Sequence, residues 1–226
     1  MTGKKLLNRT LNLIAVTLAV FFFISPKISH ANYYIGIVGI ESRVKNINLG
    51  DYKDLDSLNK HPLLEAQDIF EEILTTDLPQ TGLIGVDKTL SSKAARQSEA
   101  EFQKMQEVMR QSFSSLEKGN TSEVVKLFDK ELDYLIYGYL TNLTITHRES
   151  LATSNLTVRV DLSTRIVDAK TGKVVCVATG KGESASHGGT GRKAYNLGGK
   201  EISEESWHDA ITKAVNQIVD RIKQQV

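Results

Sequence analysis

The 226-residue sequence contains a single cysteine, Cys176, so the chain has no internal disulfide bond and its fold depends on its core alone. Cys176 lies among valines in a strand-like stretch, where we expect a small buried hydrophobe rather than a reactive thiol. No proline- or glycine-rich linker divides the chain either. We therefore expect one domain, residues 32–226, after the N-terminal leader described below.

Clusters of metal-binding residues are lacking as well. Four histidines follow the leader, each far from the others in sequence, and no second cysteine is available for a zinc site: His61, His147, His187 and His208. Asp51, Asp54 and Asp56 do not have the spacing of a calcium-binding EF-hand loop, and we interpret them as part of a solvated loop. The sequence thus predicts no metal centre.

The sequence also lacks the motifs of nucleotide binding and hydrolysis. Residues 188–193 are glycine-rich and basic, but the glycine spacing and the hydroxyl residue of a P-loop are missing there and around Gly199-Lys200. There is no G-x-S-x-G motif, and Ser186 and His187 are only neighbours in sequence. We expect neither a cofactor nor enzyme activity.

Residues 1–31 have the pattern of a secretory signal peptide. Lys4, Lys5 and Arg9 precede an uncharged run over residues 11–24, and the small residues at Ser29 and Ala31 predict cleavage between Ala31 and Asn32. Retention of the segment as a membrane anchor is the alternative, but the run is shorter than the roughly 20 residues that span a bilayer. We expect the protein to be exported.

The charge balance of the mature chain is close to neutral. The whole sequence has 28 Lys and Arg and 27 Asp and Glu, and loss of the leader removes four basic residues and no acidic one. The net charge then becomes about −3. No basic stripe with interleaved aromatic residues is present, so we expect no nucleic-acid partner.

Hydrophobic periodicity predicts alternating helices and strands along the mature chain. We expect short buried strands at residues 32–41 and 82–86, and three consecutive strands within residues 133–184. Helices are expected from Pro62 to Pro79, at 91–116, at 121–130 and from an N-cap at Ser203 to the C-terminus. Residues 42–60 and most of 180–200 are expected to be loops.

The middle strand of the C-terminal trio has the clearest pattern. Its apolar residues alternate strictly with polar ones, which indicates one buried and one solvated face; the polar residues are Thr157, Arg159, Asp161, Ser163 and Arg165. Gly172 supplies the positive φ angle that the following hairpin loop, residues 168–172, requires. The fold class is α/β: a mixed, partly antiparallel five-stranded sheet with helices packed on it.

Two motifs of these strands resemble a known family. DYLIYGYLTNLTI at residues 133–145 and VDLSTRIVDAKTGKVVCVATGKGES at 160–184 are similar to the strand core of the CsgG family, bacterial cell-envelope proteins named for the channel that secretes curli subunits. The resemblance implies a CsgG-like α/β core in the periplasm or associated with the outer membrane, acting on envelope proteins or on copies of itself.

The chain departs from the channel's pattern at two places. Asn32 stands where the channel has a lipidated cysteine, so the resemblance does not extend to a lipid anchor. The channel also carries long membrane-crossing hairpins, whereas residues 146–154 (THRESLATS) are too short for an inserted strand pair, and residues 184–202 lack alternating apolar residues.

These features favour an exported CsgG-like envelope protein that acts by protein–protein contact in assembly or curli-type secretion. The alternatives are a subunit of an oligomeric outer-membrane secretion channel and a periplasmic regulator of a cell-wall synthase. The solvated face of the middle strand is our candidate contact surface: Thr157, Arg159, Asp161, Ser163 and Arg165. The alternatives for this face are an ordinary solvated sheet surface and a surface that a helix covers.

Overall fold

The computed structural model of the chain describes residues 32–44, 61–88, 99–149, 154–187, 194–197 and 200–225. The predicted leader, the aspartates of the 42–60 segment and the glycine-rich residues 188–193 lie outside the described residues.

Five strands form one mixed sheet, as the sequence predicts. Their order across the sheet is β2-β1-β3-β4-β5; β1 is parallel to both of its neighbours, and β4 is antiparallel to β3 and β5. The strands span Tyr33–Ser42 (β1), Leu83–Asp87 (β2), Tyr134–Glu149 (β3), Ser154–Asp168 (β4) and Val174–His187 (β5). A hairpin of Ala194–Leu197 (β6) and Lys200–Ser203 (β7) precedes the last helix. The predicted α/β class is confirmed.

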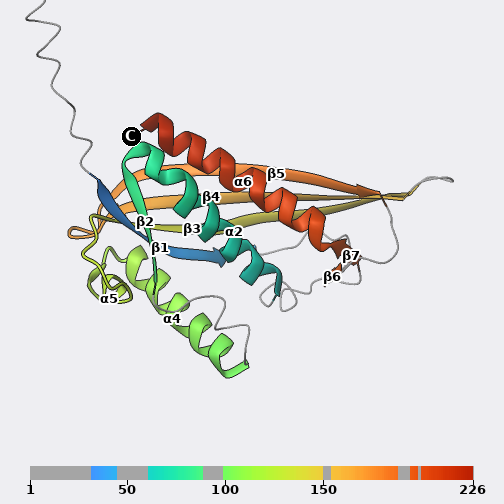
Figure 1. Cartoon of the computed structure of the whole chain (residues 1–226). Coiled ribbons are helices and arrows are strands. Elements are labelled where there is room, and N and C mark those ends of the chain that lie inside the picture. The colour runs from blue at the N-terminus through green and yellow to red at the C-terminus, as the bar shows by residue number, and fades with distance from the viewer. Residues whose placement is uncertain are drawn as a thin grey trace, which may run out of the picture. The chain divides into compact units, whose positions relative to one another are not determined.

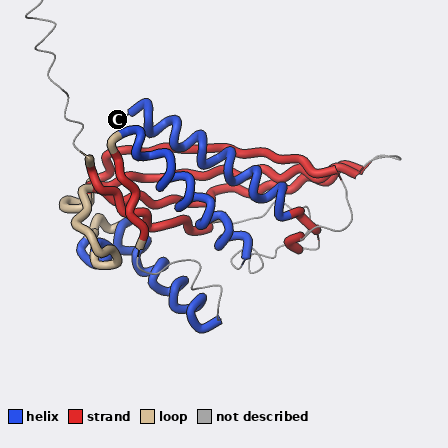
Figure 2. The backbone as a smooth tube through the Cα atoms, in the orientation of Figure 1, coloured by secondary structure: helices blue, strands red, loops and turns tan. Residues whose placement is uncertain are grey.

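Helices pack on both faces of this sheet (Figures 1 and 2). Helices α2 (His61–Asp77) and α6 (Glu204–Gln225) lie against one face, which we call the inner face, and share its aliphatic core. Helix α4 (Glu99–Glu117) and the one-turn α5 (Ser122–Val125) pack on the outer face, over β1 and the first half of β3. The 3-10 helix η1 (Leu78–Thr81) joins α2 to β2.

The strands differ in length, and this leaves part of the outer face without a helix. The pairing of β1 with β3 ends at Leu140, whereas β3 continues to Glu149 and stays paired with β4, which in turn pairs with β5 up to His187. In Figure 1, β3, β4 and β5 run side by side beyond the end of β1, with α6 along their inner face. Residues 146–149 are the end of β3, and Ser154 is the start of β4.

The inner core follows the predicted alternation. Val158, Val160, Leu162 and Ile166 of β4 are buried on the inner face, where α6 presents one continuous buried face: Trp207, Ala210, Ile211, Ala214, Val215, Ile218, Val219 and Ile222. The indole N–H of Trp207 donates to the carbonyl oxygen of Pro62 at 3.0 Å and ties α6 to α2. Ser203 is the predicted N-cap, because its Oγ accepts from the Ser206 N–H at 3.1 Å.

Residues 180–187 all belong to β5, although the sequence placed them partly in the third strand and partly in the following loop. The two glycines that suggested a loop serve close packing instead. A Cβ on Gly180 would overlap the carbonyl oxygen of Ala214, and one on Gly182 would overlap that of Ala210. Only glycine lets the backbone of β5 approach α6 this closely. Residues 194–197, also predicted as loop, pair with residues 200–203 in the β6–β7 hairpin.

The predicted helix at residues 121–130 is reduced to the single turn of α5. The segment is held by contacts with the β4–β5 turn rather than by a longer helix. The Thr121 hydroxyl donates to the Ala169 carbonyl oxygen at 2.7 Å, and Gly119 packs backbone to backbone against Gly172. Tertiary contacts have therefore overridden the local helical pattern.

The turn between β4 and β5 has the predicted chemistry. Gly172 has a φ of 69°. The Asp168 carboxylate accepts hydrogen bonds from the N–H and hydroxyl groups of Thr171 and from the Lys170 N–H. These bonds lower the pKa of Asp168. The turn is thus fixed by its own side chains.

Candidate functional site

None of the described helices covers the outer face of β4, β5 and the second half of β3. We call this surface the open face; it consists of Asn142, Thr144, Thr157, Arg159, Asp161, Ser163, Arg165, Val177, Thr179, Lys181 and Glu183. The five residues predicted from the sequence all lie on it. Arg159 and Arg165 are exposed, whereas Thr157, Asp161 and Ser163 are half-buried.

Strand register sets which open-face side chains meet. Asn142, Asp161 and Lys181 are directly paired across β3, β4 and β5, and Thr144, Arg159 and Glu183 form the next row. Side chains opposite each other in neighbouring strands are close enough to interact, so the open face is a set of short cross-strand rows.

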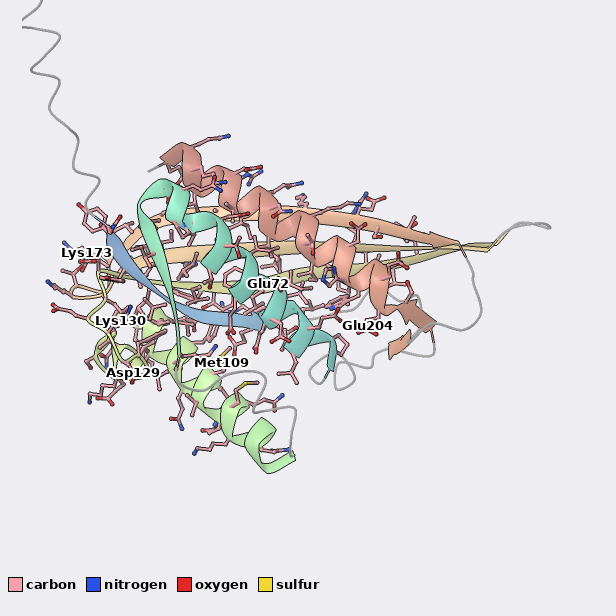
Figure 3. All side chains as sticks on the ribbon, viewed as in Figure 1. Glu72, Met109, Asp129, Lys130, Lys173 and Glu204 are labelled. Carbon is pink, nitrogen blue, oxygen red and sulfur yellow. The ribbon has the colours of Figure 1, made fainter. Side chains whose placement is uncertain are left out.

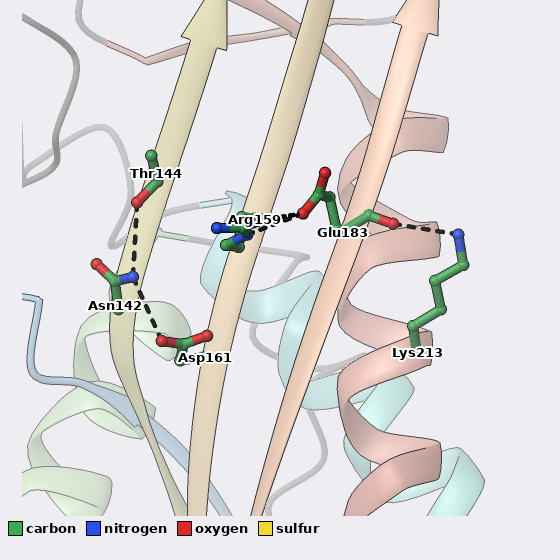
Figure 4. A network of polar contacts seen from close by, with 6 residues as sticks. All are labelled: Asn142, Thr144, Arg159, Asp161, Glu183 and Lys213. Atoms are coloured by element: carbon green, nitrogen blue, oxygen red, sulfur yellow. Dashed lines mark hydrogen bonds and ion pairs between the residues drawn. The ribbon is translucent and has the colours of Figure 1, made fainter.

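Polar contacts connect these rows (Figure 4). The Arg159 guanidinium forms an ion pair with Glu183, with its Nε at 2.8 Å from Oε2. Asn142 donates weakly to Asp161 Oδ2 at 3.4 Å and to Thr144 Oγ1 at 3.5 Å. The three strands are thereby linked on the outer face, although exposed pairs of this type contribute little to stability.

A shallow hollow of about 440 Å³ lies among these side chains, lined by Asn142, Thr144, Arg159, Asp161, Lys181, Gly182 and Glu183. Within the described part of the chain, Asp161 Oδ1 is buried and has no hydrogen-bond partner. The hollow thus offers a donor, the Lys181 ammonium group, to a polar group of a contacting molecule, whereas Asp161 Oδ1 is too buried to accept from one.

The outer edge of β5 is partly occupied by α6. Lys213, Gln217 and Arg221 follow one another at helical i,i+4 spacing and reach the strand in order. Lys213 Nζ donates to the Glu183 carbonyl oxygen at 3.1 Å, the Lys181 N–H donates to Gln217 Oε1 at 3.0 Å, and Arg221 contacts the Thr179 hydroxyl. Such side chains satisfy backbone groups that an edge strand otherwise leaves unpaired.

This protection ends before the first residues of β5. Val174, Val175 and Val177 are 50%, 54% and 50% exposed, and the only other large apolar side chain that is exposed among the described residues is Tyr33. Three exposed valines within four residues form an apolar patch beside the basic side chain of Arg165, which lies directly opposite Val177 on β4. Contiguous apolar patches of this kind often mark interaction sites.

A second polar cluster on the outer face is structural. The Tyr139 ring packs edge-on against Phe113 and Tyr137, its hydroxyl donates to Glu117 Oε1 at 3.0 Å, and the Arg43 guanidinium lies 3.7 Å from the ring centre. Burial raises the pKa of Tyr139 to about 12. These contacts join α4 to β1 and β3.

The residues tested for chemistry do not come together. Among residues the structure describes, no group of three or more His, Cys, Asp or Glu side chains could hold a metal ion. Cys176 is buried, its thiol donates to Gln225 Oε1, and burial raises its pKa, so the reactive thiolate is disfavoured. His208 is exposed on α6, with Thr212 as its polar neighbour.

Sequence analysis missed the β5 half of the open face. Lys181 and Glu183 escaped notice because most of residues 180–200 was expected to be loop, and Val177 was assigned to a strand without regard to which face it occupies. The alternation of Val177, Thr179, Lys181 and Glu183 with small residues could have revealed it, since a strand packed closely under a helix needs small residues on its inner face. In the described part of the chain, no helix has the length and apolar character needed to cross a membrane.

Residues 146–226 match the model of a family described as curli production assembly/transport component CsgG. The match covers β4, β5 and α6 and confirms, for these residues, the resemblance that the strand motifs suggested. A search of curated proteins gives no match.

Three solved structures resemble the chain at low sequence identity. Lipoprotein GNA1162 from Neisseria meningitidis is 12% identical, with 71% of this chain and 88% of that chain covered and a TM-score of 0.37. The hypothetical protein CT253 from Chlamydia trachomatis is 13% identical, with 86% and 98% covered and a TM-score of 0.45. The PelC dodecamer from Paraburkholderia phytofirmans is 12% identical, with 87% and 92% covered and a TM-score of 0.36.

Proposed function

We propose that this chain, whose residues 146–226 match the CsgG family, is an exported envelope protein that acts by protein–protein contact in assembly or curli-type secretion. The observation that carries the proposal is the open face. It lies on β4 and β5, within the residues that match the family, and its outer surface has no covering helix among the described elements.

The chemistry of the open face favours a protein partner. It offers polar donors and acceptors in rows beside an apolar patch, which is the usual combination of a protein interface. Two of its basic side chains, Arg165 and Lys181, have no ion-pair partner among the described residues. Charges that are unpaired in the free protein are available to a partner and favour its correct orientation.

The channel-subunit alternative requires an apolar surface that faces lipid. Where β3 and β4 extend past β1, their outward side chains include Thr144, Thr146, Thr157 and Arg159, which are polar. This composition favours an aqueous contact surface over a lipid-facing wall. A cell-wall synthase regulator would use the same open face, so the partner's identity distinguishes that alternative.

The proposal is tested by reversing two charges of the open face, Arg159→Glu with Arg165→Glu, in a tagged protein isolated from cells with its cross-linked partners. We expect the variant to fold normally and to lose its partners. Lys104→Glu, an exposed reversal on α4, is the matched control and should keep them. If the double variant retains every partner of the wild-type protein, the open face is not the contact surface.

A further inference from the structure

The start of β5 is an edge strand that α6 leaves open. Backbone N–H and C=O groups of an antiparallel edge strand point alternately toward and away from its partner. The Lys181 N–H and the Glu183 carbonyl both point away from β4, since they bond to α6. By the same alternation the N–H and C=O of Val177 and Thr179 also point outward.

The four outward positions differ in what covers them. Side chains of α6 bond to the backbone at Lys181 and Glu183, and Arg221 reaches the Thr179 side chain. At Val177, no described residue bonds to the outward N–H or C=O. The open stretch of the edge therefore coincides with the exposed valines, and an unpaired edge flanked by apolar side chains is a template for strand addition.

The charges around the valines select the kind of strand. Arg165 lies across from Val177, Lys173 directly precedes Val174 and points into solvent in Figure 3, and Arg221 borders the patch from α6. The nearby Asp168 carboxylate is engaged by three hydrogen bonds within its own turn. Three basic side chains thus outnumber the exposed carboxylate of Asp220 on α6, so the complementary strand is acidic.

From this geometry we propose that Val174–Val177 is a strand-addition site for an extended segment of a partner protein in which apolar residues alternate with carboxylates. The inference rests on the proposed function and gives it a partner chemistry. The segment's backbone pairs with the outward groups of Val177 and its apolar side chains lie over the exposed valines. Its carboxylates, on the opposite face of the segment, meet Arg221 of α6.

The test uses the purified ¹⁵N-labelled protein and two synthetic peptides of about eight residues, one alternating valine with glutamate and the other valine with lysine. We expect saturable shifts of the amide signals of Val175, Val177 and Thr179 with the acidic peptide, which should bind at least about tenfold tighter than the basic one. No shift, or equal shifts with both peptides, overturns the proposal.

Two variants separate the backbone contribution from the charge contribution. Val177→Pro removes an outward N–H that makes no bond to β4. The fold should therefore tolerate the change, whereas binding of the acidic peptide should be lost. Arg221→Glu should reverse the preference between the peptides, and it keeps the test decisive if the proline variant does not fold. If either variant binds the acidic peptide as tightly as the wild-type protein does, the proposed strand-addition site is contradicted.

Other occupants have their own signatures in the same experiment. Shifts at the valines that appear with anionic phosphatidylglycerol vesicles and not with the peptide would assign the patch to a membrane. Shifts that grow with protein concentration alone would assign it to a second copy of the chain. Either result overturns the proposal, whereas the proposed function fails only if the charge-reversed open face also keeps its partners in cells.

Discussion

Gly182 lies directly beneath Ala210: the α-carbon of the strand residue is so close to the helix that a Cβ would overlap the Ala210 carbonyl oxygen. Gly180 has the same relationship to Ala214, one turn further along α6. Two glycines on alternate positions of β5 and two alanines one turn apart on α6 thus form a close helix–strand contact. This contact fixes the edge strand from the inner side and leaves its outer side free.

Replacing Gly182 by alanine should separate β5 from α6. Because the clash is with backbone atoms, which cannot rotate away, we expect a loss of about 3 kcal/mol or more in the free energy of unfolding. Lys181→Ala, on the exposed side of the same strand, should change stability by less than about 0.5 kcal/mol. Urea unfolding followed by circular dichroism compares the two, and equal effects would contradict the close contact.

Gly119 and Gly172 provide a second matched pair. Both have positive φ, 73° and 69°, but a Cβ on Gly119 would have space, whereas one on Gly172 would overlap the Gly119 carbonyl oxygen. Gly119→Ala should therefore lower the free energy of unfolding by only about 1 kcal/mol, the penalty for a non-glycine residue in the left-handed conformation. Gly172→Ala should lower the free energy of unfolding by about 2 kcal/mol more than Gly119→Ala does, because of the added steric overlap. Thermal unfolding of both variants checks this, and the account fails if Gly119→Ala is the more damaging change.

Lys88 and Glu71 form a buried ion pair, with Nζ and Oε1 2.7 Å apart and the Lys88 side chain only 4% exposed. Glu71→Gln leaves the Lys88 ammonium group without its counter-charge, and we expect this to lower the free energy of unfolding by about 3 kcal/mol. Adding Lys88→Met removes the stranded charge, so the double variant should be more stable than the sum of the single changes predicts. A double-mutant cycle in urea measures the coupling; additive effects would show that the pair is not coupled.

The buried phenol of Tyr139 makes the free energy of unfolding depend on pH in the alkaline range. Its ordinary pKa is 10.0, and burial raises the folded value to about 12. Between these values the unfolded chain has released the phenolic proton and the folded chain retains it, so stability falls as pH rises from about 10 to about 12. Tyr139→Phe should remove this component of the decline. Phenolate absorbance measured during titration gives the pKa directly, and a value near 10 in the folded protein would contradict the buried environment.

The sequence predicted the elements whose pattern is local. The strict alternation of β4, the apolar face of α6 and the Gly172 turn each reflect a single element, and all three are present as expected. The five predicted contact residues share one face for the same reason, because period two determines which side chains lie together. Their role in contact remains a prediction.

Features that depend on distant residues could not be predicted in this way. Gly180 and Gly182 looked like turn residues because their purpose, close approach to α6, involves a helix about 30 residues later in the sequence. The helical pattern at residues 121–130 gave way to the contact of Thr121 with Ala169. The open edge at Val177 likewise follows from where Lys213, Gln217 and Arg221 reach β5, which no local pattern contains.

The most direct test of the central claim, that the open face is the contact surface, is site-specific photo-crosslinking in cells. A photoreactive residue placed at Ser163 or Thr179 on the open face should give discrete adducts with another envelope protein. The same residue at Asn216, on the exposed side of α6, should give none. Adducts from Asn216 with none from Ser163 or Thr179 would contradict the account and move the contact surface to the helical side of the molecule.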